Sequence, residues 1–267
     1  MRSDLKRLAG PGSVLAAALF FGGCDQILGP THVDDNWRVS ERGRFAFYVR
    51  PDSFAERSLD TLSTVLEDQY DTAVARLGLT YSGRVSMFLF NSGTDAGFGN
   101  DNGGGNHSGT AYSMTASVRV ACVPPLDIHL FSLLTHEANH VITQNGLGRP
   151  GTSFVSEGLA SAVISERHGA YGRTFYYEWT AARRTQLPPI AALVDDAKWS
   201  GYQQPVSYGV SASFLAYLLE TYGPVPFRSI YYAGSRDFAA TFASAYGRPL
   251  DVAEREWIDF CVRRAGT

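Results

Sequence analysis

The sequence lacks an excess of basic residues. Its 267 residues include 23 Lys and Arg against 26 Asp and Glu, which gives a formal net charge of −3. A nucleic-acid partner is therefore not expected. Internal repeats are also absent, and the apolar run at 14–21 is too short to span a bilayer as a permanent helix. What remains is an ordinary hydrophobic content of 45%, typical of a globular chain with a substantial core.

The first 24 residues differ from the rest. A basic beginning at 2–7 and the apolar run precede Gly22, Gly23 and Cys24, an order that resembles a bacterial lipoprotein signal. The resemblance implies cleavage before a lipidated Cys24 and attachment to a membrane of the cell envelope. Because Phe21 is less usual than leucine at its position, ordinary secretion stays open. Either way we expect an exported protein.

Cysteine is scarce, with three residues in the chain. If Cys24 is lipidated or removed, Cys122 and Cys261 remain as one pair in an oxidising compartment. A disulfide between them and two free buried thiols are both compatible with the sequence. Neither cysteine has zinc-finger spacing, so neither is assigned to a metal.

Residues 136–140 read His-Glu-Ala-Asn-His. Asp127 is a plausible N-cap, and apolar residues then recur at helical spacing until Gly146, so a helix is predicted here. On that helix His136 and His140 lie one turn apart on the same face and can reach one metal ion, while Glu137 lies beside them. The alternative is an amphipathic core helix whose histidines only form hydrogen bonds.

Glu157 follows 17 positions after His140, on a second predicted helix. It would complete a His-His-Glu set for one Zn²⁺ per chain and leave the fourth position to water. In this hypothesis zinc lowers the pKa of the water toward ~7 and Glu137 accepts its proton as general base.

These motifs resemble those of the gluzincin metallopeptidases, especially the short peptidase-MA-like domains related to the catalytic domain of zinc aminopeptidases. The resemblance depends on three motifs: the HExxH sequence at 136–140, the segment Ser156-Glu157-Gly158-Leu159-Ala160, and a tyrosine-led helix at 207–223. The resemblance implies a zinc peptidase with a peptide or protein substrate. It also implies that Tyr208 stabilises the oxyanion, with Tyr171 and Tyr202 as weaker alternatives.

Two departures from the aminopeptidases bear on function. The spacer between His140 and Glu157 holds 16 residues, slightly fewer than in those enzymes. No Gly-x-Met-Glu-Asn stretch, which holds a substrate's free amine, precedes His136, so endopeptidase action is favoured over aminopeptidase action. Two other functions stay open: an exported zincin-like binding or scaffold lipoprotein without turnover, and a zinc hydrolase of a non-peptide amide or ester. The sequence gives no indication of oligomeric state.

The fold class expected is α+β and zincin-like. After a leader (1–24) and a linker (25–36), a single domain (37–267) would comprise a mixed α+β half at 37–146 and an all-helical half at 147–267. The resemblance to the gluzincins implies that the active-site cleft lies between the two halves. The first half would contain strands at 44–49, 84–90 and 116–123 and a helix at 59–77. The helices expected in the second half are at 153–168, 173–184, 207–222, 225–232, 236–246 and 250–264.

Several segments have less certain roles. The strand at 117–123 is either an edge that pairs with an extended peptide or an internal strand, and Arg119 on it is either a substrate contact or a solvated side chain. The glycine-rich stretch 92–109 is favoured as a mobile loop over a calcium or nucleotide site. The stretch 185–206 is expected to be a long irregular connection near the cleft.

The remaining histidines are not expected to bind the metal. His129 would have a surface or core role, and His168 would close the helix that carries Glu157. No role is assigned to His32 or His107.

Overall fold

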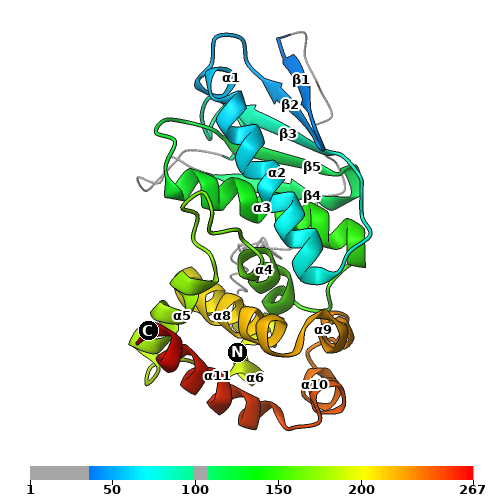
Figure 1. Ribbon diagram of the computed structural model, residues 1–267, viewed down its shortest axis with the longest axis vertical. Helices are drawn as coiled ribbons and strands as arrows, with labels where there is room; N and C mark the ends of the chain where they lie inside the picture. Colours follow the sequence, from blue (N-terminus) through cyan, green and yellow to red (C-terminus); the bar gives the residue numbers. More distant parts are fainter. Residues whose placement is uncertain (1–35, 99–107, 267) are drawn as a thin grey trace, which may run out of the picture.

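A computed structural model describes residues 36–98 and 108–266 of the chain. The expected leader with Cys24, most of the linker, His32, His107 and the centre of the glycine-rich stretch lie outside the described residues. The structure is mixed α+β, with a sheet and two long helices above a group of helices (Figure 1). The strands are β1 (Arg38–Arg42), β2 (Phe45–Val49), β3 (Val85–Phe90), β4 (Gly109–Tyr112) and β5 (Ser117–Ala121).

The five strands form one sheet in the order β1-β2-β3-β5-β4. The central pairs β2–β3 and β3–β5 are parallel, whereas the outer pairs β1–β2 and β4–β5 are antiparallel. The strand at 117–121 is therefore internal, and the alternative that made it an edge is wrong. Among the described strands the edge on that side is β4, which was not expected because it begins inside the glycine-rich stretch.

Side chains alternate across the sheet as the strand period requires. Val85, Met87 and Leu89 of β3 lie in the main core, against α2 (Leu59–Leu77) and α3 (Ile128–Leu147), while Phe88 and Phe90 face the opposite side. On that opposite side the Arg119 guanidinium lies 4.9 Å from the Phe90 ring centroid and donates to the carbonyl of Ala96. Arg119 is thus packed against the sheet, so the alternative that made it a solvated side chain is wrong.

The two long helices begin and end largely where the sequence indicates. Gly78, with φ 58°, ends α2 in the left-handed conformation that glycine adopts at low cost. Asp127 caps α3 by accepting a hydrogen bond from the backbone N–H of Leu130 at 2.9 Å. Gly146 does not end α3, which continues to Leu147; a Cβ at Gly146 would lie 2.8 Å from Cδ1 of Leu79. Close packing rather than helix termination accounts for that glycine.

The second half of the chain is helical, and no strand occurs between residues 147 and 266. Two short helices, α6 (Ile190–Leu193) and α7 (Asp196–Trp199), lie in the stretch 185–206, which was expected to be irregular. The helices are α4 (Ser153–Ala162), α5 (Arg173–Arg183), α6 (Ile190–Leu193), α7 (Asp196–Trp199), α8 (Gln204–Tyr222), α9 (Pro224–Tyr231), α10 (Phe238–Tyr246) and α11 (Leu250–Ala265), with α1 (Phe54–Arg57) in the first half.

The helix that carries Glu157 is shorter than expected, because α4 ends at Ala162 rather than at 168. The carbonyl groups of Ala162, the last residue of α4, and of Ile164 accept hydrogen bonds from Arg76 of α2. His168 therefore does not close α4, and its Nε2 lies 3.8 Å from Asp68. Tertiary hydrogen bonds from α2 replace the helical ones that the sequence pattern predicted.

One hydrophobic cluster extends from the sheet through α3 and α4 to α11. Cys122 lies in the sheet half and Cys261 in α11; both are buried and neither forms a disulfide. The alternative of two free thiols is the one observed. No helix within the described ranges is long and apolar enough to cross a membrane.

Candidate metal centre

The two ligand helices bring three side chains to one point. Nε2 of His136 and Nε2 of His140 lie 3.0 Å apart, and Oε2 of Glu157 lies 3.2 Å from the first and 3.3 Å from the second. His136 and His140 come from adjacent turns of α3, whereas Glu157 comes from α4. Within the described residues this is the one group of three or more His, Cys, Asp or Glu side chains that can hold a metal ion.

These distances match the demands of a small tetrahedral ion. Imidazole and carboxylate ligands bind zinc at about 2.0–2.1 Å, so a tetrahedral arrangement separates them by about 3.3–3.4 Å. The three measured separations, 3.0, 3.2 and 3.3 Å, are close to that value. Two histidines and one glutamate, with the fourth coordination position open to water, are also the ligands of known catalytic zinc sites. The residues present therefore fit the metal that the sequence predicted.

The electrostatics of Glu157 also suit a ligand. Only 4% of the residue is exposed, and that burial works to raise its pKa. The charge of His140 and the hydrogen bonds from both histidines outweigh burial and hold the pKa of Glu157 well below its usual range. Histidines that bind a metal are neutral, so in a metal-bound site the ion would take the place of their charge in keeping the carboxylate ionised.

Glu137 lies on the same helix but is not part of the ligand triangle. The residue is 7% exposed, and its Oε2 atom is buried with no hydrogen-bond partner in the structure. Burial raises the pKa of Glu137, against the opposing effects of His136 and His140 and of the Ala111 backbone N–H. A buried oxygen without a partner beside a ligand set is what a proton acceptor for a water molecule at the site requires.

Strand β4 packs directly on Glu137. A Cβ at Gly109 would lie 2.8 Å from Cγ of Glu137, so only glycine permits this approach without displacing the carboxylate. Ala111 contributes the backbone hydrogen bond to the same carboxylate. The edge of the sheet and the candidate base are thus in direct contact, which the sequence did not reveal.

Of the three tyrosines considered, Tyr208 is the one that the structure brings to the ligands. Its ring centroid lies 5.8 Å from that of His136, and the Trp199 ring lies 5.8 Å away on α7. Tyr171 instead contacts His129, with its hydroxyl 3.5 Å from Nδ1, and Tyr202 packs against the core. His129 is exposed and contacts Tyr171, which is the surface role among those expected for it.

Sequence reasoning missed Ser161 and Tyr176. The Oγ atom of Ser161 lies 3.0 Å from Nδ1 of His136, and Ser161 also hydrogen-bonds Tyr176 of α5. When Nε2 of His136 faces a metal, Nδ1 carries the proton and donates a hydrogen bond to Oγ of Ser161, which fixes the ring orientation. The signal that could have found Ser161 is its spacing, since it lies one helical turn after Glu157 on the same face.

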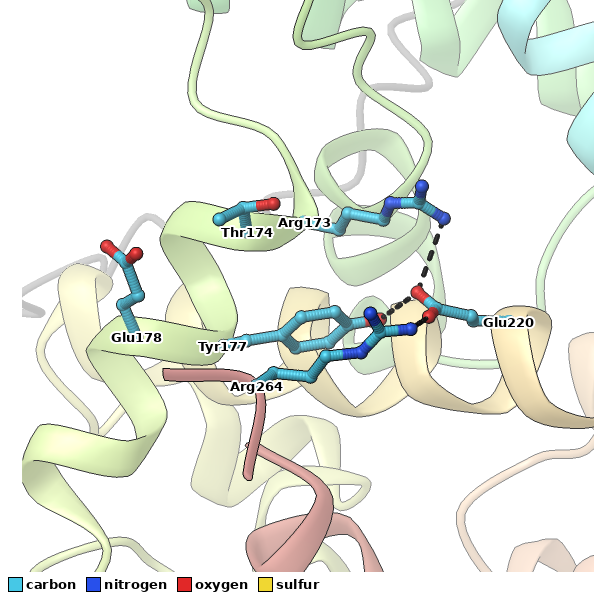
Figure 2. Close-up of a pocket in the computed structure, with 6 residues that line it drawn as sticks. All are labelled: Arg173, Thr174, Tyr177, Glu178, Glu220 and Arg264. Carbon is cyan, nitrogen blue, oxygen red and sulfur yellow. Dashed lines mark hydrogen bonds and ion pairs between the residues drawn. The ribbon is translucent and has the colours of Figure 1, made fainter. Parts of the chain in front are cut away.

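A separate cavity of about 270 Å³ lies between α5, α8 and α11 (Figure 2). At its centre Glu220 accepts hydrogen bonds from Arg173 and the Tyr177 hydroxyl, each at 3.2 Å, and from Arg264. The carboxylate is thus matched by guanidinium groups from two other helices. None of the metal-ligand candidates lines this cavity.

No family model matches the chain, and no curated protein matches it in sequence. The likeness to gluzincins therefore depends on the motif residues themselves. What the geometry adds is that three separate motifs, at 136–140, 157 and 208, lie next to one another in the fold.

Proposed function

We propose that the protein is a zinc-dependent metallopeptidase. The observation that carries the proposal is the ligand triangle of His136, His140 and Glu157, with edges of 3.0–3.3 Å and the unpartnered Glu137 carboxylate oxygen beside it. A histidine pair in a plain core helix would not need a buried carboxylate from a second helix at bonding distance from both rings. Burying that carboxylate beside two neutral imidazoles is costly unless a bound cation offsets its charge.

When bound, zinc would polarise the scissile carbonyl and make water nucleophilic near neutral pH. Glu137 is then the base that removes the proton from the attacking water, and it returns this proton to the leaving nitrogen. Tyr208, next to His136, supplies a hydroxyl donor to the oxygen on which negative charge develops. Ser161 holds the His136 ring in place through Nδ1.

The edge strand β4 suits an extended peptide substrate. It pairs only with β5 among the described strands and packs on Glu137 through Gly109. Gly109 and Thr110 are half-buried, whereas Ala111 and Tyr112 are buried. An edge strand can take up a peptide by backbone hydrogen bonds, and pairing at Gly109 and Thr110 would place a scissile bond near the carboxylate. Because the sequence lacks the amine-anchoring Gly-x-Met-Glu-Asn stretch, we propose that it cleaves within chains. The leader pattern supports action outside the cytoplasm, as an envelope lipoprotein or a secreted protein.

Metal analysis and a peptide-library digest test the proposal. We expect about one zinc per chain, chelator-sensitive cleavage at internal bonds, and loss of turnover in Glu137→Gln with zinc retained. Glu157→Gln should lose zinc as well as activity. Zinc at 100 times its dissociation constant should raise the free energy of unfolding by about 2.7 kcal/mol in the parent chain and not in Glu157→Gln.

The possible results of these experiments distinguish the three candidate functions: a peptidase, a scaffold protein, and a hydrolase of other amides or esters. A chain that binds zinc but cleaves no peptide, ester or amide would contradict the enzyme proposal and favour a scaffold. Cleavage of esters or non-peptide amides alone would retain the metal chemistry and replace the substrate. Absence of zinc from a folded chain would remove the proposal altogether.

A further inference from the structure

A buried amide pair links the two ligand helices. Asn139, between Glu137 and His140 on α3, donates from Nδ2 to the carbonyl of Ala160 on α4 at 2.6 Å. Ala160 lies three residues after Glu157. The bond therefore joins the helix of the histidines to the helix of the carboxylate, close to the ligands on both sides.

A second amide, from a third helix, holds Asn139 in this orientation. Gln69 of α2 donates from Nε2 to Oδ1 of Asn139 at 2.7 Å and to the carbonyl of Val163 at 3.1 Å. Its Oε1 accepts from the backbone N–H of Ser165 at 2.7 Å. Gln69 thus binds both Asn139 and the segment that follows α4.

The hydrogen bonds leave little freedom to this pair. Both Nε2 hydrogens of Gln69 and its carbonyl oxygen are used, and turning either amide over would set oxygen against oxygen. Gln69 and Asn139 are each fully buried, so water cannot replace a lost partner. A buried network in which each amide nitrogen and oxygen has a partner is rigid and specifies one arrangement.

We propose that Gln69 and Asn139 are positioning residues for the metal centre. They set the spacing between α3 and α4 so that Glu157 meets His136 and His140 at coordination distance. This inference rests on the proposed function, because it needs the triangle to hold a metal. Of the 16 residues between His140 and Glu157, only 148–152 lie outside α3 and α4. That loop joins the two helices at one end, whereas the amide pair holds them together beside the ligands.

The test compares zinc dissociation constants, by chelator competition, for the parent chain, Asn139→Leu, Gln69→Met and the double variant. We expect Asn139→Leu to weaken zinc binding about 10–100-fold, as loss of an outer-shell partner does. The double variant should be no weaker than the worse single variant, because the two residues act as one unit. With cobalt(II) in place of zinc, the visible absorption spectrum of the variants should differ from that of the parent chain, because the coordination geometry of the metal changes.

Ser213→Ala is the matched control. It removes another buried side-chain hydrogen bond, from Nε1 of Trp257 at 3.0 Å, on a part of α8 that faces α11. It should lower the melting temperature and leave zinc affinity within twofold of the parent. If Asn139→Leu does not fold, Asn139→Ser, which is too short to make both bonds, replaces it.

Two results would overturn the inference in distinguishable ways. Variants that lose thermal stability but keep the parent's zinc affinity and cobalt spectrum would show that the pair has a structural role only, while the metal centre stands. A parent chain that binds no zinc would remove the proposed function and the positioning role together.

Discussion

Gly158 and Ser211 lie in contact where α4 crosses α8. A Cβ at Gly158 would lie 2.6 Å from Cβ of Ser211 and 2.9 Å from its carbonyl carbon. Glu157 precedes the glycine, and Tyr208 lies one turn before the serine. This crossing therefore sets the position of the tyrosine helix relative to the metal ligand.

Replacing Gly158 by alanine should force the two helices apart. Because one of the clashing atoms is backbone, a rotamer change cannot relieve the overlap, and the free energy of unfolding should fall by about 1–3 kcal/mol. Zinc affinity should fall too, since α4 carries Glu157. Denaturant unfolding and chelator competition measure the two effects.

Gly234→Ala is the control for that substitution. Nothing lies within 4 Å of a Cβ at Gly234, so alanine should be tolerated there. If Gly158→Ala is as stable as Gly234→Ala and binds zinc as tightly, the helix crossing does not constrain the site.

Glu220 should contribute to stability through the cavity of Figure 2, independently of the metal. Its side chain is 19% exposed and bonds Arg173, Arg264 and Tyr177. We expect Glu220→Gln to lower the free energy of unfolding by about 1–2 kcal/mol. This loss is smaller than for a fully buried ion pair, because the guanidinium groups are partly exposed to solvent. Urea unfolding measures the loss.

Asp251→Asn gives the comparison for an exposed ion pair. Asp251 and Arg255 lie one turn apart on α11, at 3.0 Å, with side chains 68% and 66% exposed. Breaking this pair should cost about 0.3–0.5 kcal/mol. A loss in Glu220→Gln no larger than this would show that the cavity network adds nothing to stability.

The sequence predicted the parts that local periodicity encodes. The 59–77 helix, the Asp127 cap and the alternation along residues 117–122 are confirmed because each follows from the spacing of apolar residues and a terminal signal. The candidate ligands were found by spacing as well. His136 and His140 share a helix face whatever the tertiary fold.

Other features depend on contacts between distant segments. Strand β4 was missed because glycine gives no apolar alternation, yet Gly109 is required by the proximity of Glu137. The early end of α4 was missed because Arg76, 86 residues before Ala162, binds the carbonyl groups there. Gln69 carries no signal at all in a single sequence, since its role depends on α2 lying beside both ligand helices.

Cys122 and Cys261 should behave as inert thiols. Burial raises the pKa of each to about 12, so little reactive thiolate forms at pH 8. We expect neither to be alkylated in the native chain and both to be alkylated in denaturant, with mass spectrometry assigning each site. Labelling in denaturant should not require a reductant. If it does, the two cysteines form a disulfide and the free-thiol arrangement is wrong.

Tyr208 is predicted to act on the reaction and not on folding or metal binding. Its ring lies beside His136, and a hydroxyl donor that bonds the developing oxyanion is typically worth a factor of about 10²–10³ in kcat. Tyr208→Phe should therefore lower kcat by about that factor, with KM little changed and zinc content equal to the parent's. Tyr202→Phe, which removes a hydroxyl from a residue packed on the core, should keep the parent's kcat. Equal turnover in Tyr208→Phe and Tyr202→Phe would mean that the oxyanion is stabilised without Tyr208.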